Sequence, residues 1–391
     1  MPANDGVAEI APEVIAWRKH IHANPELGFA EHETAAFVAA KLKAFGLAVH
    51  TDVSRTAVVA TLTKGNGSKA IALRAELDAL PIEEMADIDY ASKNKGVMHA
   101  CGHDGHTAIL LGTAKLLAES EDFDGTVVFI FQPAEEVVGG GRQMIEDGVL
   151  ERFPVGKVFA IHNWPGFPKG QIGVLAGPQM AAVDDFEIRF HGSGCHAAMP
   201  HLGDDPVLAA ASFVTAVQRV VSRSIDPLAA AVLSVTQIHG GRFNNFVPTE
   251  AKVEGTCRFY DPVLSDHCAE EIERIARAVA TMHGVTAELN YKRGYPPVVN
   301  PAAGAGLAAL AARDTVGAGR VSTDFQPSMG CEDFAFLLRG VGDGAYAWIG
   351  AGDVGPGEGL HGDRFVFDDD IVPIGMRYFL NVVHRALPSM R

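Results

Sequence analysis

The densest group of metal-binding residue types lies at residues 97–106, VMHACGHDGH, which contain three histidines, one cysteine and one aspartate. Thiolate, imidazole and carboxylate donors together suit borderline metals such as zinc or manganese. Cys101 and His103 are two residues apart, so both side chains can reach one ion if the segment is extended or turned there. The alternative is a polar turn in which the aspartate caps the following helix and His99 and His106 are structural. This segment alone leaves both interpretations open.

Two adjacent glutamates, Glu135 and Glu136, end the segment FQPAEE, which follows an apolar strand pattern. Adjacent carboxylates repel each other unless a cation neutralises one of them. If one carboxylate binds metal, the other can act as general base for an attacking water, a division of labour that amide hydrolysis requires. The alternative is the solvated acidic start of a helix, which is common for such pairs. Their position at the end of an apolar strand favours the metal interpretation.

Two further histidines occupy comparable positions. His162 ends the strand pattern VFAIHN, and His361 lies in the glycine-rich loop GEGLHGDRF. Each alone is more often a hydrogen-bonded structural histidine than a ligand. Asp78, which follows the strand IALRAEL, is expected to orient a ligand imidazole from outside the metal's own ligand set, with a helix or turn cap as the alternative. The candidate ligands of a shared two-metal centre are therefore Cys101, His103, Glu136, His162 and His361.

The elements that must position these side chains alternate between helix and strand. The periodicity predicts a helix around residues 13–23, a second helix over residues 33–45 that Gly46 stops, and then the strands TAVVATL and AIALRAEL. The strands TVVFIF and KVFAIHN follow further on. This alternation predicts an α/β layered sheet, in which the chemistry-bearing residues follow the carboxyl ends of strands.

The pattern changes over residues 182–294 to strand, helix, two strands, helix and strand. This βαββαβ order predicts a split unit with two helices over a four-stranded sheet. We therefore expect residues 1–181 and 295–391 to form a metal-binding catalytic domain, with residues 182–294 as an inserted domain.

The composition excludes several classes of partner. The 391 residues include 48 acidic against 32 basic residues, a net charge of −16, with no run of Lys or Arg. Nucleic acid and anionic membranes are therefore poor partners. No stretch approaches the roughly 20 apolar residues of a membrane span, and the N-terminus lacks a basic region followed by an apolar one. The five cysteines are an odd number and widely scattered, which predicts free thiols and a cytoplasmic protein.

The order of motifs resembles one family. The segments that carry the resemblance are RKHIHANPELGFAEHET, LRAELDALP, MHACGHDGHT, FQPAEE, IHNWP, GCHAAMPH, GCEDFA and LHGDRF. In this order they resemble amidohydrolases of bacteria and plants that include hippurate hydrolase, N-acyl-amino-acid deacylases and indole-acetyl-amino-acid hydrolases. These belong to the wider aminoacylase and glutamate carboxypeptidase superfamily. The resemblance covers nearly the whole chain, and it implies a zinc-peptidase-like three-layer catalytic domain with an inserted α+β lid.

The resemblance also implies roles for particular residues. The five candidate ligands would bind two divalent ions of manganese, zinc, nickel or cobalt, with Cys101 contacting both ions. Glu135 would be the catalytic base, and His196 of GCHAAMPH matches a histidine that stabilises the oxyanion. Asn245 and Arg258 match positions that line the substrate pocket, although Arg258 falls on an expected edge strand, where a solvated charge is the alternative. The lid would form a homodimer, alone or within a higher oligomer.

Several positions depart from the family pattern. Cys195 stands where glycine is usual, Cys331 replaces a common serine, and Glu76 replaces a common aspartate. No ligand is changed, so the implied chemistry stands while the shape of the pocket is open. The predicted function is metal-dependent hydrolysis of small N-acyl amino acids to a carboxylate and a free amino acid. A di- or carboxypeptidase is the alternative, and a non-catalytic metal-dependent binding protein is weakest because it would have no need for Glu135.

Overall fold

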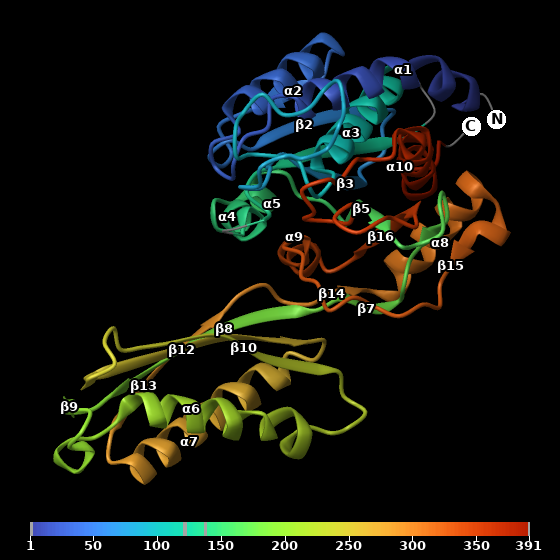
Figure 1. The fold of residues 1–391 in the computed structure, drawn as a ribbon. Coiled ribbons are helices and arrows are strands. Elements are labelled where there is room, and N and C mark those ends of the chain that lie inside the picture. Colours follow the sequence, from blue (N-terminus) through green and yellow to red (C-terminus); the bar gives the residue numbers. More distant parts are fainter. Residues whose placement is uncertain (1–2, 120–122, 137–138, 390–391) are drawn as a thin grey trace. The chain divides into compact units, whose positions relative to one another are not determined.

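A computed structural model of the protein describes residues 3–119, 123–136 and 139–389, and the chain divides into two compact units (Figure 1). Unit 1 comprises Met1–Gln179, Val298–Gln326 and Asp333–Arg391. Unit 2 comprises Met180–Pro297 and Pro327–Glu332. Unit 2 is thus inserted into the sequence of unit 1.

Across the described residues, the framework of unit 1 is an eight-stranded sheet in the order β1-β2-β4-β3-β5-β16-β6-β15. Its strands are β1 (Ala48–His50), β2 (Val58–Lys64), β3 (Ala70–Glu76), β4 (Gly125–Gln132), β5 (Lys157–Pro165), β6 (Ile172–Gly173), β15 (Val321–Ser322) and β16 (Gly344–Gly352). The central strands β4, β3, β5 and β16 are mutually parallel. Their carboxyl ends therefore meet at one edge of the sheet.

Helices cover this sheet. They are α1 (Ala3–His22), α2 (His32–Ala44), α3 (His103–Glu119), α4 (Gly140–Glu146), α5 (Val149–Arg152), α8 (Ala302–Val316), α9 (Phe334–Val341) and α10 (Val372–Ala386), with the short 3₁₀ segments η3 (Ala318–Arg320) and η4 (Asp369–Ile371). Helices α1, α3 and α10 pack on one another, and α3 packs on β3. Residues 127–132 of β4 are all buried, as expected for a central strand covered on both faces. The predicted α/β class is confirmed.

The first helix is longer than predicted. The sequence pattern placed it around residues 13–23, whereas α1 runs from Ala3 through Pro12 to His22. Val7, Ile10 and Val14 are all buried in the unit 1 core, so the apolar stripe continues across the proline. Packing of this stripe outweighs the hydrogen bond that Pro12 cannot donate.

Unit 2 is a four-stranded antiparallel sheet in the order β10-β12-β8-β13, packed against α6 and α7. Its elements are β8 (Ala182–His191), β9 (Cys195–His196), η1 (Pro200–Leu202), α6 (Pro206–Val217), the π-helical segment η2 (Val220–Ser224), β10 (Ala231–Gly240), β11 (Phe246–Val247), β12 (Glu250–Phe259), α7 (Val263–His283) and β13 (Thr286–Arg293). Alternate residues of β8 and β12 are buried against the helices, and α7 buries the stripe Cys268, Ile272, Ile275 and Val279. The pairing of β7 (Gly177–Met180) with β14 (Val298–Asn300) lies where the chain passes between units.

The expected edge position of Arg258 is wrong. Arg258 lies on β12, which is flanked by β10 and β8 and is therefore an interior strand. Strand order depends on contacts distant in sequence, which the local pattern of β12 does not encode. Among the described residues, no helix is both long and apolar enough to cross a membrane.

Candidate metal centre

The five predicted ligands gather at the carboxyl edge of the unit 1 sheet. Cys101 and His103 stand at the start of α3, Glu136 follows β4, His162 lies in β5, and His361 lies in the loop after β16. Parallel β3, β4 and β5 deliver their following segments to the same edge, which explains why ligands far apart in sequence converge.

Backbone constraints hold three of these candidate ligands in place. Gly102 has φ +98°, and a Cβ there would lie 2.1 Å from Asn163 Oδ1, so glycine is required between Cys101 and His103. His361 also has positive φ, +62°, and its N–H donates to the carbonyl of Ala100 at 2.8 Å. The loop that carries His361 is thereby fastened next to Cys101.

The donor atoms form two trios that share Cys101. Cys101, His103 and His162 make one trio, and Cys101, Glu136 and His361 make the other, with donor atoms within 4.8 Å of one another in each. Cys101 Sγ lies 3.4 Å from His162 Nε2, and His361 Nε2 lies 3.3 Å from Glu136 Oε2. These two trios would hold divalent ions, with Cys101 available to either trio.

Buried atoms without hydrogen-bond partners support the fit to metal. Within the described part of the chain, His103 Nε2 and Glu136 Oε1 are buried and have no hydrogen-bond partner, and they lie 4.0 Å apart. Burial and the charges of Glu136 and Glu135 raise the pKa of the Cys101 thiol well above its usual value. A divalent cation would satisfy both orphaned atoms and stabilise the thiolate, so the donor set fits metal.

The two imidazoles of the first trio differ in charge but both present Nε2. Burial opposes charging of His103, yet its hydrogen bond to Asp78 and the nearby carboxylates raise its pKa to about 10. Burial and the neighbouring His106 and His103 lower the pKa of His162 well below its usual value. His162 Nδ1 donates to the Asn163 carbonyl at 2.6 Å, which leaves Nε2 for a metal.

Asp78 connects ligands from both trios. Its carbonyl accepts a hydrogen bond from His103 Nδ1 at 2.9 Å, and its carboxylate Oδ1 lies 3.3 Å from the same nitrogen. Its other oxygen, Oδ2, accepts the N–H of Glu136 at 2.9 Å. This geometry supports the orienting role that the sequence suggested for Asp78.

Glu135 lies beside the ligands and is buried, with 6% of its surface exposed. Its Oε2 lies 4.0 Å from His103 Nε2, and its Oε1 accepts the N–H of Asp333 at 3.3 Å. A carboxylate in this position is close enough to serve a water molecule held at the ligand cluster.

The sequence interpretation missed a buried network behind the ligands. His106 Nδ1 lies 2.8 Å from Glu76 Oε2, and His106 Nε2 lies 2.7 Å from Asn163 Oδ1. Burial would raise the pKa of Glu76, but Arg74 and His106 hold it well below its usual value. The signal was available, because Glu76 and Arg74 are charged residues within an otherwise apolar strand, yet their partners are distant in sequence.

Two of the three remaining candidates come together in unit 2. His196 on β9 pairs with Phe246 on β11, and the Ala197 N–H donates to the carbonyl of Asn245 at 3.0 Å. His196 and Asn245 are exposed. Arg258 instead lines a pocket of about 430 Å³ on the sheet, where its Nη1 donates to Thr256 Oγ1 at 3.1 Å.

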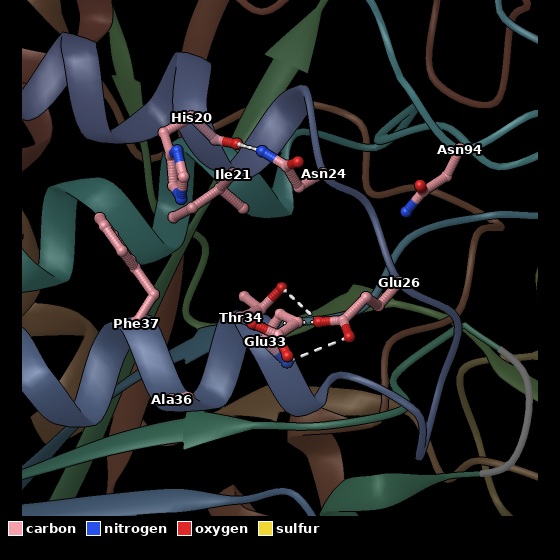
Figure 2. Close-up of a pocket in the computed structure, with 9 residues that line it drawn as sticks. All are labelled: His20, Ile21, Asn24, Glu26, Glu33, Thr34, Ala36, Phe37 and Asn94. Carbon is pink, nitrogen blue, oxygen red and sulfur yellow. Dashed lines mark hydrogen bonds between the residues drawn. The ribbon is translucent and has the colours of Figure 1, made fainter.

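A separate pocket of unit 1, of about 460 Å³, shares no residue with the ligand set (Figure 2). His20 and Asn24 of the α1 end and Phe37 of α2 line it. The Glu26 carboxylate, which also lines it, accepts hydrogen bonds from the backbone N–H groups of Glu33 and Thr34, so Glu26 stabilises the first turn of α2.

Several known proteins are similar to this chain in sequence and in fold. An N-acyl-L-amino acid amidohydrolase of Geobacillus stearothermophilus is 45% identical over 299 residues, which cover 75% of this chain and 80% of that protein. An N-acetyl-L-cysteine deacetylase of Bacillus subtilis is 38% identical, covering 96% of this chain and 88% of that protein. The crystal structure of a dinuclear metal-binding peptidase of the M20 family from Bacillus subtilis matches with a TM-score of 0.83 at 34% identity, covering 96% and 98% of the two chains.

The α/β sheet, with donor groups that could hold metal at one edge, is the architecture of a metal-dependent hydrolase. The family model for peptidase family M20/M25/M40 matches residues 72–385. The chain belongs to this family, and the predicted family and enzyme class are confirmed.

Proposed function

We propose that this hydrolase cleaves the amide bond of small N-acyl amino acids, releasing a carboxylate and a free amino acid. The observation that carries the proposal is the pair of ligand trios sharing Cys101 with the buried Glu135 beside them. The amidohydrolase and deacetylase names of the relatives support the same substrate class.

Glu135 is proposed as the proton carrier. Its carboxylate takes a proton from the attacking water and returns it to the nitrogen of the leaving amine, so it acts as base and then as acid. Such a group contributes about 10²- to 10⁴-fold to the rate. The hydrogen bond from the Asp333 N–H fixes one oxygen of Glu135, so the other, Oε2, faces His103 and the ligands.

Two divalent ions held by the five ligands would polarise the scissile carbonyl and lower the pKa of a coordinated water. Manganese, zinc, nickel and cobalt are all compatible with the mixed thiolate, imidazole and carboxylate set. Asp78 orients His103 and Glu136 for this role.

His196 is proposed to stabilise the oxyanion of the tetrahedral intermediate. Its Nδ1 accepts the Ala198 N–H at 3.1 Å, so the neutral ring carries its proton on Nε2 and can donate there. Such a donor stabilises the transition state by roughly 3 kcal/mol. Asn245 and Arg258 are proposed to contact the substrate, and unit 2 to act as a lid that also forms a homodimer.

The test is a hydrolysis screen of purified protein treated with chelator and then loaded with manganese, zinc, cobalt or nickel. The substrates are benzoylglycine, N-acetyl amino acids, indole-acetyl amino acids and dipeptides, with Glu135→Gln as the inactive control. We expect release of free amino acid from at least one acyl class, only after metal loading. Full activity in verified metal-free protein would refute the metal mechanism, and cleavage of dipeptides alone would replace the proposal with a peptidase.

A further inference from the structure

The turn that carries Glu135 and Glu136 begins with a strained residue. Ala134 is fully buried and has φ +53°, a left-handed conformation that costs free energy for any residue with a Cβ. Both glutamates follow directly, so their positions depend on this backbone conformation. A strained turn persists only where its surroundings hold it in place.

Glu31 provides that support from a segment about a hundred residues earlier. Its carboxylate is fully buried, and Oε1 accepts the backbone N–H of Ala134 at 2.8 Å. Its other oxygen, Oε2, accepts the hydroxyl of Thr56 at 2.5 Å, which fixes the carboxylate itself. Glu31 is the N-cap residue of α2 but makes no side-chain cap hydrogen bond, so its carboxylate is left for Ala134 and Thr56.

Two further contacts enclose the same residue. The Gly140 N–H donates to the Ala134 carbonyl at 2.9 Å. A Cβ on Gly28 would lie 3.0 Å from the Cα of Ala134, so the segment before α2 packs directly against the turn. Both polar backbone groups of Ala134 therefore have specified partners.

We infer that Glu31 is a positioning residue that fixes the turn so that Glu135 faces the reacting water and Glu136 enters the ligand set. Two buried carboxylates divide this work, because Glu31 holds the amide of residue 134 and Asp78 holds the amide of residue 136. The base lies between these two fixed points. The role of Glu31 in turnover rests on the proposed function, whereas its role in metal binding does not.

The test compares Glu31→Ala, which removes the acceptor, with Glu31→Gln, which keeps a carbonyl acceptor for the Ala134 N–H. Glu26→Ala is the matched control, since Glu26 is a carboxylate of the same segment whose side-chain hydrogen bonds go to Glu33 and Thr34 of α2 (Figure 2). Metal affinity is measured by competition with a chromogenic chelator, and kcat and KM are measured per metal-loaded site on whichever acyl amino acid the wild type hydrolyses.

Glu31→Ala is expected to lose about 10- to 100-fold in metal affinity, the usual effect of removing a group that orients a ligand. We also expect kcat to fall by at least about tenfold with KM nearly unchanged, because the base is displaced while substrate contacts remain. Glu31→Gln should recover most of both losses. Glu26→Ala should lower the melting temperature while keeping metal affinity and kcat.

Two further variants extend the test, and the second of them, Thr56→Val, keeps it decisive if Glu31→Ala fails to fold. Ala134→Gly removes the cost of the left-handed conformation, so the double variant Glu31→Ala/Ala134→Gly should bind metal more tightly than Glu31→Ala. Thr56→Val, which frees one oxygen of Glu31, should give a smaller loss in the same direction.

Wild-type metal affinity and kcat in folded Glu31→Ala would overturn the inference, as would a Glu31→Gln variant that is damaged equally. A wild-type enzyme that hydrolyses no acyl amino acid would refute the proposed function instead. The chelator competition would then still decide whether Glu31 positions Glu136.

Discussion

Metal-free protein holds two ligand protons that metal binding must displace. The raised pKa of Cys101 keeps this residue a thiol at neutral pH, and the pKa of about 10 keeps His103 an imidazolium. Both residues belong to the trio with His162, which releases no proton because its lowered pKa leaves it neutral. We therefore predict that loading this trio releases two protons.

The free-energy cost of displacing one of these protons follows from the pKa of His103. Its pKa of about 10 lies three units above pH 7, and each unit corresponds to 1.36 kcal/mol, so deprotonation costs about 4 kcal/mol. Because both pKa values are raised, the competing protons are fully bound at low pH and are lost only as pH rises toward them. Metal affinity should therefore increase by about a hundredfold per pH unit between pH 6 and pH 8, tenfold for each proton.

Isothermal titration calorimetry in buffers of different ionisation enthalpy counts these protons. Titration at pH 6 keeps protons from metal-coordinated water out of the measured proton release, because the pKa of such a water lies at about 7. Cys101→Ser should reduce the release from two protons to one, since a serine hydroxyl has no proton to lose at this pH. Cys195→Ser is the matched control, because the half-buried Cys195 belongs to unit 2 and should leave the release at two. A release below one proton, or an affinity independent of pH, would refute the reasoning.

Three further predictions test the assigned roles. Glu135→Gln should keep its metal but lose about 10²- to 10⁴-fold in kcat, whereas Glu136→Gln should lose metal. Plasma mass spectrometry beside kinetics measures both effects, and equal metal loss in the two variants would contradict the different roles assigned to the two glutamates. In metal-free protein at neutral pH, peroxide should modify the half-buried Cys195 and Cys331 before Cys101, because burial and a raised pKa keep Cys101 a thiol, and peptide mass spectrometry that found Cys101 modified first would contradict this. If His196 acts on the active site of the neighbouring subunit in a homodimer, inactive Glu135→Gln and His196→Ala chains should together recover about half of wild-type activity in mixed dimers. No recovery would mean that His196 acts only within its own chain.

The fold could be predicted where burial patterns are local. The buried strands β3, β4 and β5 and the amphipathic α7 were readable because each shows, in its own sequence, either a largely apolar run or a buried stripe at helical spacing. The position of β12 inside its sheet was not readable, because its alternating pattern suits an edge or an interior strand equally. The prediction of the first helix omitted residues 3–12, because the helix continues across Pro12 through packing of its buried stripe, which local sequence does not specify.

The ligands could be proposed from residue type and from their positions after strands. The buried residues that position these ligands could not be predicted in the same way. In the sequence, Glu31 and Glu76 are ordinary acidic residues. Glu31 accepts a hydrogen bond from the backbone amide of Ala134, which is 103 residues away. Glu76 pairs with His106, which is 30 residues away. Such pairings depend on which segments the sheet topology brings together, which no local pattern specifies.

The proposed division of labour between Glu135 and Glu136 depends on the conformation of the turn that carries them. In a continuing strand, successive side chains would point to opposite faces of the sheet, and only one carboxylate could approach His103. In this turn, a carboxylate oxygen of each glutamate lies 4.0 Å from His103 Nε2. β4 ends at Gln132, and the left-handed Ala134 turns the chain two residues later, so the strained residue whose N–H Glu31 accepts is also the one that would let adjacent acids serve one site as base and ligand.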